Sequence, residues 1–566
     1  MKRARWILLP SLLSLVILAS WLWWTRPTKV DMAIYAPADS LLYLEANRPF
    51  EVVNAIAGTE AWKAFELAGG PPQSPPSPWL QSFVGWTGIG PINSVILARA
   101  QVAAVVTDLR TVEEGDTLNI KSEGALIVET HTAERRIRAP FGAALKTLAE
   151  KTYGNPTLRT VSIEGVEFNE WSAPEGSRQI VGAVLGSLIV IGTSERVVQD
   201  CLAVSQGRRS SLSADPDLQA MRVQLESGKA LTFGYVPAGN SGKLLGVGVP
   251  LLMGRAPGDS EFQRLITNGA TKVFGSLGWT SRPYLTGIED RYLISLQPSV
   301  IARLKPGFAS NNINPKLENV VPNGAYSVTT YKFADPQAAW LSLKTAVSSQ
   351  VDALSAIVFS SLLKSALLSY GIDDPDLFLK AVDGELLTLR VDETAERSIL
   401  IASVRDRVAL HQLMAKRMSQ RTPSARAEVF EDVTGEFAAS LSDEFIVIGN
   451  PADVRRYVAT KEEPGALASA DNLRRMTLFS SARSATNVVT YTDDAERVRS
   501  FISAVITAKG ASVRTGEIED SLTKLPYSIT ETTLGDRGIE RITRSPLGQF
   551  SSLLPVLFPQ QPGPNK

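Results

Sequence analysis

Two stretches of the sequence nearly repeat each other: FIVIGNPADV at residues 445–454 and LIVIGTSERV at residues 188–197. Each begins with a short apolar run, which is typical of a strand that is buried on both faces. Each continues with a side chain that can cap a helix, Asn450 in one stretch and Ser194 in the other. The two stretches therefore predict the same unit twice, a buried strand followed by a capped helix.

The two apolar runs also predict which side chains share a face of the strand. Successive side chains of a strand point to opposite faces, so the isoleucines of each run should point one way and the central valine the other. No polar residue interrupts either run, so we expect six buried side chains: Ile189, Val190, Ile191, Ile446, Val447 and Ile448. Gly192 and Gly449 end the two strands. We expect the chain to turn sharply into the helix at these glycines, and a side chain there would hinder the turn.

The similarity extends outward from these two stretches in the same order. A repeat of this length that keeps its order is far stronger evidence of duplication than one shared phrase. The matching segments are 37–47 with 322–335, 125–130 with 399–404, 140–151 with 407–416, 161–168 with 428–435, 180–187 with 437–444, 212–221 with 467–476, and 283–299 with 526–546. They predict strands with local hairpins and separate helices, with a turn at Glu164 and Gly165 in one of the hairpins.

The predicted fold class is α+β, with two diverged copies of a strand-rich unit, an antiparallel sheet and packed helices, behind one N-terminal transmembrane helix. A chain of 566 residues is too long for one core, so several domains are expected. The expected organisation is a cytoplasmic basic stub at 1–5, a transmembrane anchor at 6–24, repeat halves at 33–304 and 318–555 separated by a linker at 305–317, and a flexible proline-rich tail at 556–566.

The halves differ most after their first strand. Two short helices and the proline-rich loop GGPPQSPPSP at residues 69–78 are expected in the first half. The second half has apolar residues at steps of three and four from Trp340 to Leu362, which predicts one long helix over 336–370. We expect this helix to be packed on both sides, and a face that contacts lipid or a partner is the alternative.

The N-terminus has the pattern of a membrane anchor. The nineteen residues from Trp6 to Trp24 carry no charge, which is long enough for a helix to cross a bilayer. Tryptophans stand at both ends of this segment, and the cations Lys2, Arg3 and Arg5 precede it, which favours a cytoplasmic N-terminus and an exported body. Cleavage as a signal peptide near Ala19 is the alternative, but the apolar run continues beyond that residue.

A family resemblance follows from these features. The N-terminal anchor, PADSLLYLEAN at 37–47, the mid-chain LIVIG followed by ALTFGYV at 230–236, and a closing RSPLG at 544–548 resemble an uncharacterised bacterial family of exported, membrane-anchored proteins, catalogued as a domain of unknown function. The resemblance implies an exported, membrane-anchored protein. Because no other segment reaches eighteen apolar residues, we expect one membrane crossing and a periplasmic body, as in a signal-anchor protein. Its shared phrases are strand and cap patterns, so it implies no catalytic residue.

The composition argues against several kinds of chemistry. Lysine plus arginine equals aspartate plus glutamate, 58 against 58, whereas a nucleic-acid binder needs a basic face. Catalysis by a serine or cysteine nucleophile most often needs a histidine base, and the chain has only His131 and His411. His411 matches Lys146 in the repeat, which predicts a surface position. Cys201 matches Val458, which predicts a small core residue.

Apparent motifs fail on spacing. Gly242-Lys243 lacks the earlier glycine and the following serine or threonine of a phosphate-binding loop. Ser361 with Lys364, and Ser521 with Lys524, match SxxK without its companion motifs. The acidic group around Asp374 lacks the glycine and distal glutamate of a calcium loop, and we interpret it as a helix cap before Pro375.

The expected function is therefore a non-catalytic, membrane-tethered envelope protein that acts as a scaffold or binding module. Its expected partners are the lipid bilayer, through the N-terminal helix, and an envelope protein or lipid, with no nucleic acid. No catalytic, cofactor-binding or metal-binding residue and no cofactor is predicted. The alternative is an extracytoplasmic hydrolase with a carboxylate-based or Ser/Lys-based site that the sequence does not reveal.

Overall fold

The structure is a computed structural model that describes residues 29–67, 96, 99–114, 117–176, 178–252, 260–308, 321–322, 325–351, 353–390, 398–420, 427–462, 475, 486–495, 497–499, 502 and 515–553. The expected anchor at 6–24, the loop at 69–78 and the tail at 556–566 lie outside the described residues, as does nearly all of the helix expected at 467–476. In the part of the chain that is described, no helix is long and apolar enough to cross a membrane.

The described strands form one sheet of 20 strands, and all of their pairings are antiparallel. The sheet and its helices confirm the α+β class. The first ten strands are β1 (Leu42–Ala46), β2 (Gln101–Glu114), β3 (Thr117–Glu129), β4 (Thr157–Ile163), β5 (Val166–Ser172), β6 (Gln179–Leu185), β7 (Leu188–Gly192), β8 (Thr232–Val236), β9 (Phe274–Tyr284) and β10 (Gly287–Leu296).

The second ten strands follow after residue 320. They are β11 (Ser327–Lys332), β12 (Val382–Arg390), β13 (Ile399–Val404), β14 (Met418–Gln420), β15 (Glu428–Asp432), β16 (Ala438–Leu441), β17 (Phe445–Gly449), β18 (Val488–Thr492), β19 (Ser528–Leu534) and β20 (Gly538–Ser545).

The described α-helices of the first half are α2 (Pro49–Ala57), α3 (Glu60–Leu67), α6 (Glu134–Tyr153), α7 (Glu195–Ser205), α8 (Pro216–Gln224), α9 (Ser241–Leu252), α10 (Ser260–Val273) and α11 (Pro298–Leu304). Those of the second half are α12 (Pro336–Ser348), α13 (Ala353–Leu368), α14 (Pro375–Ala381), α15 (Arg407–Arg417), α16 (Pro451–Glu462) and α19 (Thr515–Leu522).

The order of the strands across the sheet is the same when it is read from either end. From one end it runs β4-β5-β6-β7-β3-β2-β1-β8-β9-β10, and from the other end β14-β15-β16-β17-β13-β12-β11-β18-β19-β20. The two series meet where β10 pairs with β20. The sheet is therefore continuous between the predicted halves, and the hydrogen bonds of its central strand pair join them.

The two opening stretches form equivalent strands in this order. β7 lies between β6 and β3, and β17 lies between β16 and β13. The registers also agree, because Gly192 pairs with Val181 and Gly449 pairs with Ala438, and these two partners hold the same place in the matching segments 180–187 and 437–444. Five of the six side chains expected to be buried are buried, whereas Ile191 is half-buried. The Ile191 side chain packs at the edge of the apolar cluster under α6, so part of it stays exposed.

Opposite faces of these strands are covered by different helices. Val190 packs with Val198 and Cys201 of α7, whereas Ile189 belongs to the cluster of Phe141 and Leu145 of α6. The second half repeats the arrangement, since α16 covers the face of Val447, and α15 covers the face of Ile446 and Ile448. The expected alternation of side chains is confirmed.

The two glycines that end these strands serve a purpose different from the expected one. Neither has a positive φ, so no unusual turn requires glycine. A Cβ on Gly192 would lie 2.7 Å from Cγ2 of Val198, and a Cβ on Gly449 would lie 2.8 Å from Cγ2 of Ile399. Close packing on neighbouring side chains, rather than turn geometry, therefore excludes a larger residue.

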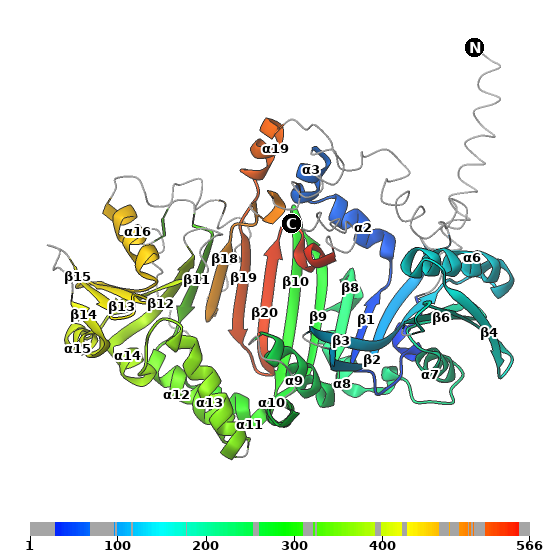
Figure 1. Cartoon of the computed structure of the whole chain (residues 1–566), viewed down its shortest axis with the longest axis horizontal. Helices are drawn as coiled ribbons and strands as arrows, with labels where there is room; N and C mark the ends of the chain where they lie inside the picture. Colours follow the sequence, from blue (N-terminus) through cyan, green and yellow to red (C-terminus); the bar gives the residue numbers. More distant parts are fainter. Residues whose placement is uncertain are drawn as a thin grey trace, which may run out of the picture.

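Helices of one half pack against helices of the other half at two places (Figure 1). Above the central strands in Figure 1, α3 packs on α19, in an apolar cluster that includes Phe65, Ile518 and Leu522. Below them, α10 and α11 pack on α13 and α12, in a cluster that includes Ile301 and Ala346. In each place the helices that follow the first strand of one half meet helices of the other half.

The prediction of one long helix over 336–370 is wrong. The structure has α12 and α13 instead, and α12 ends at Ser348. The hydroxyl of Ser349 donates to the carbonyl of Ala346 at 3.2 Å, and that of Ser348 donates to the carbonyl of Thr345 at 3.4 Å. Such bonds compete with the helical pattern, so adjacent serines favour an end there.

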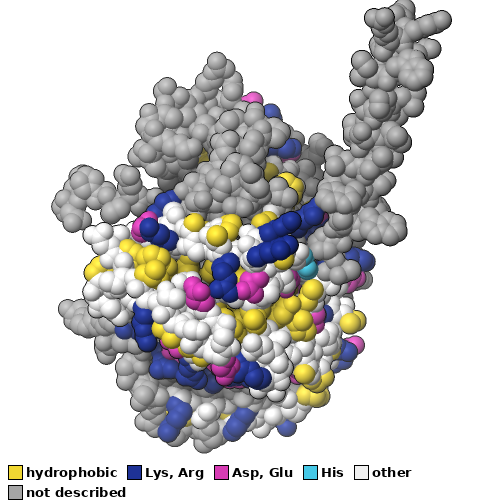
Figure 2. Space-filling view, turned by 90° about the vertical axis from the view of Figure 1, so that its right-hand side faces the viewer, with side chains coloured by type: hydrophobic (Ala, Val, Ile, Leu, Met, Phe, Trp, Pro, Cys, Tyr) yellow, Lys and Arg dark blue, Asp and Glu magenta, His cyan; other side chains and the backbone are white. Residues whose placement is uncertain are grey.

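The end of the molecule that carries β4 and α6 has a mixed surface. Figure 2 shows basic and acidic side chains intermingled there with small apolar areas. Several of them form surface ion pairs, such as Arg138 with Glu167 at 3.1 Å. Exposed pairs of this kind are worth less than about 1 kcal/mol each.

Candidate functional site

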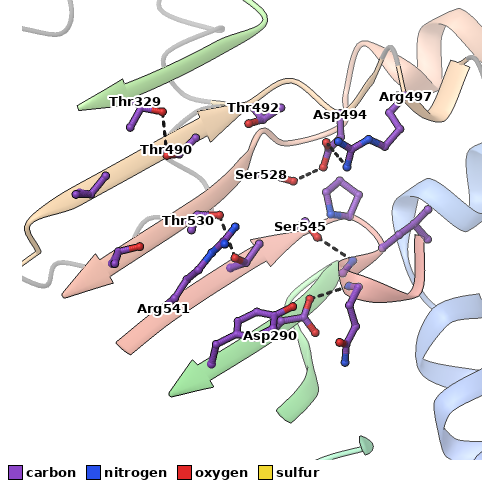
Figure 3. Close-up of a pocket in the computed structure, with 18 of the residues that line it drawn as sticks. Asp290, Thr329, Thr490, Thr492, Asp494, Arg497, Ser528, Thr530, Arg541 and Ser545 are labelled. Atoms are coloured by element: carbon purple, nitrogen blue, oxygen red, sulfur yellow. Dashed lines mark hydrogen bonds and ion pairs between the residues drawn. The ribbon is translucent and has the colours of Figure 1, made fainter. Parts of the chain in front are cut away.

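A row of four threonines crosses the second half of the central sheet. Thr329 of β11 lies opposite Thr490 of β18, Thr490 lies opposite Thr530 of β19, and Thr530 lies opposite Thr543 of β20. Directly opposed residues of neighbouring strands present their side chains on the same face of the sheet. Asp290 of β10 continues the row beyond Thr543. We call the four hydroxyl residues the threonine row (Figure 3).

The threonine row forms the floor of an open groove of about 700 Å³. Its hydroxyl groups bond in pairs, with 3.0 Å between Oγ1 of Thr329 and Oγ1 of Thr490, and 3.0 Å between Oγ1 of Thr530 and Oγ1 of Thr543. Threonine suits a sheet because it is β-branched, yet it is small enough to leave space above the strands. Further hydroxyl groups of Thr492, Ser528, Thr532 and Ser545 line the groove.

The corresponding row of the first half is filled by an aromatic side chain. Counted from the central strand pair, it consists of Tyr292, Trp279, Gly234 and Leu44, which lie opposite one another in β10, β9, β8 and β1. The indole of Trp279 covers Gly234, where a Cβ would lie 2.1 Å from Cε2 of the ring. The second half thus has small hydroxyl residues and open space where the first half has a packed indole.

Asp290 closes one end of the groove. The carboxyl group is buried, with 1 % of the residue exposed. Its Oδ1 accepts a hydrogen bond from the hydroxyl of Ser281, and its Oδ2 accepts one from the backbone N–H of Gln549 at 2.8 Å. Burial raises the pKa of Asp290 to about 6, against the hydrogen bond from Ser281, which lowers it.

The bonds of Asp290 hold the C-terminal turn η6 (Gly548–Leu553) at the rim of the groove. The side chain of Gln549 also donates to the hydroxyl of Ser281, so Gln549 contacts both members of the pair. Gly548 has a φ of 60°, and a Cβ there would lie 2.8 Å from Oδ2 of Asp290. Glycine is therefore required where the turn approaches the carboxyl group.

A second buried carboxyl group, Asp494, lies on another side of the groove. It accepts a hydrogen bond from the hydroxyl of Ser528, and Nη1 of Arg497 lies 3.7 Å from its Oδ1. Burial raises the pKa of Asp494, and the hydrogen bond from Ser528 opposes that shift. Figure 3 shows this group of three residues beside the threonine row.

Arg541 and Tyr292 form the remaining polar wall. Arg541 is exposed, and its guanidinium carbon lies 5.8 Å from the centre of the Tyr292 ring, which is within the range of a cation–π contact. Burial raises the pKa of Tyr292 to about 12, so the phenol is protonated at neutral pH. The side chain can thus donate and accept hydrogen bonds in the groove.

The opposite face of the same strands carries a buried ion cluster. Nε of Arg544 donates to Glu289 at 2.8 Å, and its Nη1 donates to Glu531 at 2.7 Å. Glu289 also bonds Arg282 at 2.6 Å and Arg291 at 2.7 Å. Although burial raises the pKa of Glu289, the hydrogen bonds from Arg291 and Arg544 hold it below its ordinary value. These ion pairs join β9, β10, β19 and β20 beneath the groove.

The structure places the two histidines and the cysteine away from the groove. His411 is on the surface, as expected, and its Nε2 lies 3.4 Å from Glu428. His131 has partners that the sequence did not reveal, since its Nε2 lies 3.2 Å from Oε1 of Gln101 and its backbone N–H bonds Glu129. Cys201 is buried in the core, where burial raises the pKa of its thiol to about 12.

The other residues considered in the sequence also lie elsewhere. Asp374 caps α14 through a 3.1 Å bond from the N–H of Leu377, as expected. Ser361 and Lys364 lie in α13, and Lys524 forms an exposed pair with Asp520 at 3.7 Å. None of these residues lines the groove. Among the described residues no group of three or more His, Cys, Asp or Glu could hold a metal ion.

Sequence reasoning missed the groove although a signal was present. The strands read SVTTYK at 327–332, VVTYT at 488–492 and SITETTL at 528–534, with threonine or serine at alternate positions. Such alternation is also typical of a strand with one solvated face, so it does not by itself indicate a site. What distinguishes the groove is that the threonines of four strands lie in register.

The arrangement offers hydrogen-bonding groups rather than an assembled reaction centre. Both acids in the groove accept hydrogen bonds from serine hydroxyls, and one of them also holds the backbone of the C-terminal turn. The geometry is that of a polar binding surface. No family model matches the chain, and neither a curated protein nor a solved structure matches it.

Proposed function

We propose that the protein is a non-catalytic, membrane-tethered envelope protein whose central groove binds a polar ligand outside the cytoplasm. The observation that carries this proposal is the difference between the two matching rows. Four small hydroxyl residues leave a groove of about 700 Å³ in the second half, where the first half has a tryptophan packed on a glycine. Ligand sites are usually concave, and convergent polar groups in them fix the orientation of the ligand.

The proposed architecture is an internal duplication behind an N-terminal anchor. The shared strand order and the matching registers of β7 and β17 support the duplication, with halves near 33–304 and 318–555. The anchor at 6–24 rests on its uncharged length and its flanking tryptophans. The body is then periplasmic, which also fits the resemblance to exported bacterial proteins of unknown function.

Two experiments test the proposal. The first is a reporter that fluoresces only in the cytoplasm, fused after Lys566. It should stay dark if the body is exported, and bright cells would contradict the proposed topology.

The second is photo-crosslinking in cells from Arg541, which is exposed in the groove. Arg159 of β4, whose side chain is 67 % exposed at the far end of the sheet, is the matched control. The groove position should yield a specific adduct that the control lacks. Identical patterns from the two positions would contradict a binding role for the groove.

A further inference from the structure

We infer that the ligand of the groove is a neutral, hydroxyl-rich molecule, a short uncharged saccharide chain, and that each protein chain binds one. This inference rests on the proposed function and adds the chemical class and the stoichiometry. The chemical class follows from the hydrogen-bonding capacity, the charge balance and the strand pairing of the groove. The stoichiometry follows from the corresponding row of the first half, where Trp279 fills the space above Gly234.

The hydrogen-bonding capacity of the floor suits a partner that both donates and accepts. In each threonine pair one hydroxyl donates to the other, so a pair retains one O–H to donate as well as lone pairs to accept. Neighbouring rows add hydroxyls of Thr492 and Thr532. Strand spacing separates these groups by about 4.8 Å across the sheet and about 6.8 Å along it. Saccharide hydroxyls have the same dual capacity and repeat along a chain.

The charges that line the groove balance one another. They are the carboxyl groups of Asp290 and Asp494 and the guanidinium groups of Arg497 and Arg541. Arg497 lies near Asp494, at 3.7 Å, and Arg541 lies over the Tyr292 ring. An anionic ligand would lie near two acids as well as the two arginines, and a cationic ligand would lie near two arginines as well as the two acids, so each sign of charge has a repulsive cost. A neutral ligand avoids both costs.

A peptide fits this surface less well than a saccharide. Peptides that bind sheets usually pair with the backbone of an exposed edge strand. The strands beneath the groove, β10, β20, β19, β18 and β11, each have a paired neighbour on both sides. They offer side chains only. The rings of Tyr292 and Tyr331 line the same groove and give apolar surface for the C–H faces of a sugar.

The test uses the full chain in detergent and isothermal titration with maltopentaose, cellopentaose and chitopentaose. An oligogalacturonate, a chitosan oligomer and a capped neutral peptide represent the other ligand classes. The variants Thr490→Val and Thr530→Val remove groove hydroxyls while keeping the side-chain shape. The matched control is Thr330→Val, because Thr330 lies next to the row on β11 but is fully buried on the other face.

We expect one neutral pentasaccharide bound per chain, at least tenfold weaker binding in Thr490→Val and Thr530→Val, and unchanged binding in Thr330→Val. Thermal unfolding of each variant separates lost binding from lost folding. Equal saccharide affinity in the wild type and both groove variants would overturn the inference. Preferred binding of a charged oligomer or of the peptide, weakened by the same variants, would also overturn it but would leave the proposed function standing.

Absence of binding by every probe overturns the saccharide inference as well. In that case the crosslinking from Arg541 decides the proposed function separately. A specific adduct from the groove would keep the binding role and require another ligand class, whereas no adduct would remove both proposals.

Discussion

Arg291 of β10 lies directly opposite Ile542 of β20 at the centre of the sheet. Each is the fifth residue of its strand, counted from Gly287 or Gly538, and both strands begin with Gly-Ile-Glu. On one side of this pair Ile288 of β10 lies opposite Ser545 of β20, and on the other side Ile294 lies opposite Ile539. Counted from the first glycine, Ile288 and Ile539 hold the same place in their strands, as do Ile294 and Ser545. The two central strands are therefore paired as two strands related by a two-fold axis would be, although their sequences differ.

The first prediction is that neither half folds alone. The apolar cluster above the central strands in Figure 1 contains Phe65 of the first half and Leu522 of the second. The cluster below them contains Ile301 of the first half and Ala346 of the second, so each half supplies only part of each cluster. Expressed separately, residues 33–304 and 318–555 should show little cooperative unfolding by circular dichroism. Expressed together, they should form a 1:1 complex on size-exclusion chromatography. A cooperative, monomeric single half would contradict this expectation.

The second prediction concerns the filled row. Gly234→Ala places a methyl group 2.1 Å from the Trp279 ring, and overpacking of this kind costs about 1–3 kcal/mol. Trp279→Ala alone leaves a cavity and costs up to about 3–5 kcal/mol. The double variant should be less destabilised than the sum of the two, because each change relieves the other.

Chemical denaturation of the four proteins measures that coupling. Gly142→Ala is the control, since Gly142 lies in α6 with open space around it and alanine favours a helix. Strict additivity of Gly234→Ala and Trp279→Ala would show that the indole does not occupy the space above Gly234.

The third prediction tests the buried ion cluster. Arg544→Met removes a cation from between Glu289 and Glu531, which are 1 % and 5 % exposed. Loss of one partner of a buried pair costs about 3–5 kcal/mol because the carboxylates stay buried. Arg541→Met, on the same strand but exposed on the groove side, should change the unfolding free energy by about 0.5 kcal/mol or less. Equal effects of the two substitutions would contradict the burial of the cluster.

The fourth prediction concerns the pH dependence of stability. The pKa of Asp290 is about 6 in the folded protein against an ordinary value of 3.8, so the folded state binds this proton more tightly. Its contribution is fully present below pH 3.8 and is lost as the pH rises through 6, by a total of about 3 kcal/mol. Asp290→Asn removes that titration.

The measurement is the difference in unfolding free energy between Asp290→Asn and the wild type, from pH 4 to pH 8. The other titrating groups are common to both proteins, so the difference reports Asp290. It should shift in favour of the variant as the pH rises. The lost hydrogen-bond acceptor adds a constant offset. A pH-independent difference would contradict the raised pKa.

The sequence predicted those parts of the fold that depend on local pattern. The runs LIVIG and FIVIG became the strands β7 and β17, and the turn expected at Glu164 and Gly165 joins β4 to β5 with both residues at positive φ. Each of these features is set by residues close together in the chain, through alternation, turn chemistry and capping.

Other features depend on which distant segments meet. The pairing of β10 with β20 and the packing of α3 on α19 join residues more than 200 positions apart, for which no local pattern exists. The groove depends on four threonines in register and on the absence of an indole like that of Trp279. The sequence of a single strand such as VVTYT indicates only that one face of the strand is polar. The groove could therefore not be predicted from the sequences of its strands.

The last prediction returns to the two repeated strands. Val190 and Val447 are 0 % and 6 % exposed, and each packs beneath the helix that follows its strand. An aspartate at either place would bury an unpaired charge between sheet and helix, which we expect to cost about 3–5 kcal/mol. Leu158→Asp on β4, where leucine is 51 % exposed, should cost less than about 1 kcal/mol. Denaturant unfolding of the three variants measures these costs, and an effect of Val190→Asp or Val447→Asp as small as that of Leu158→Asp would show that the strand is not covered by its helix.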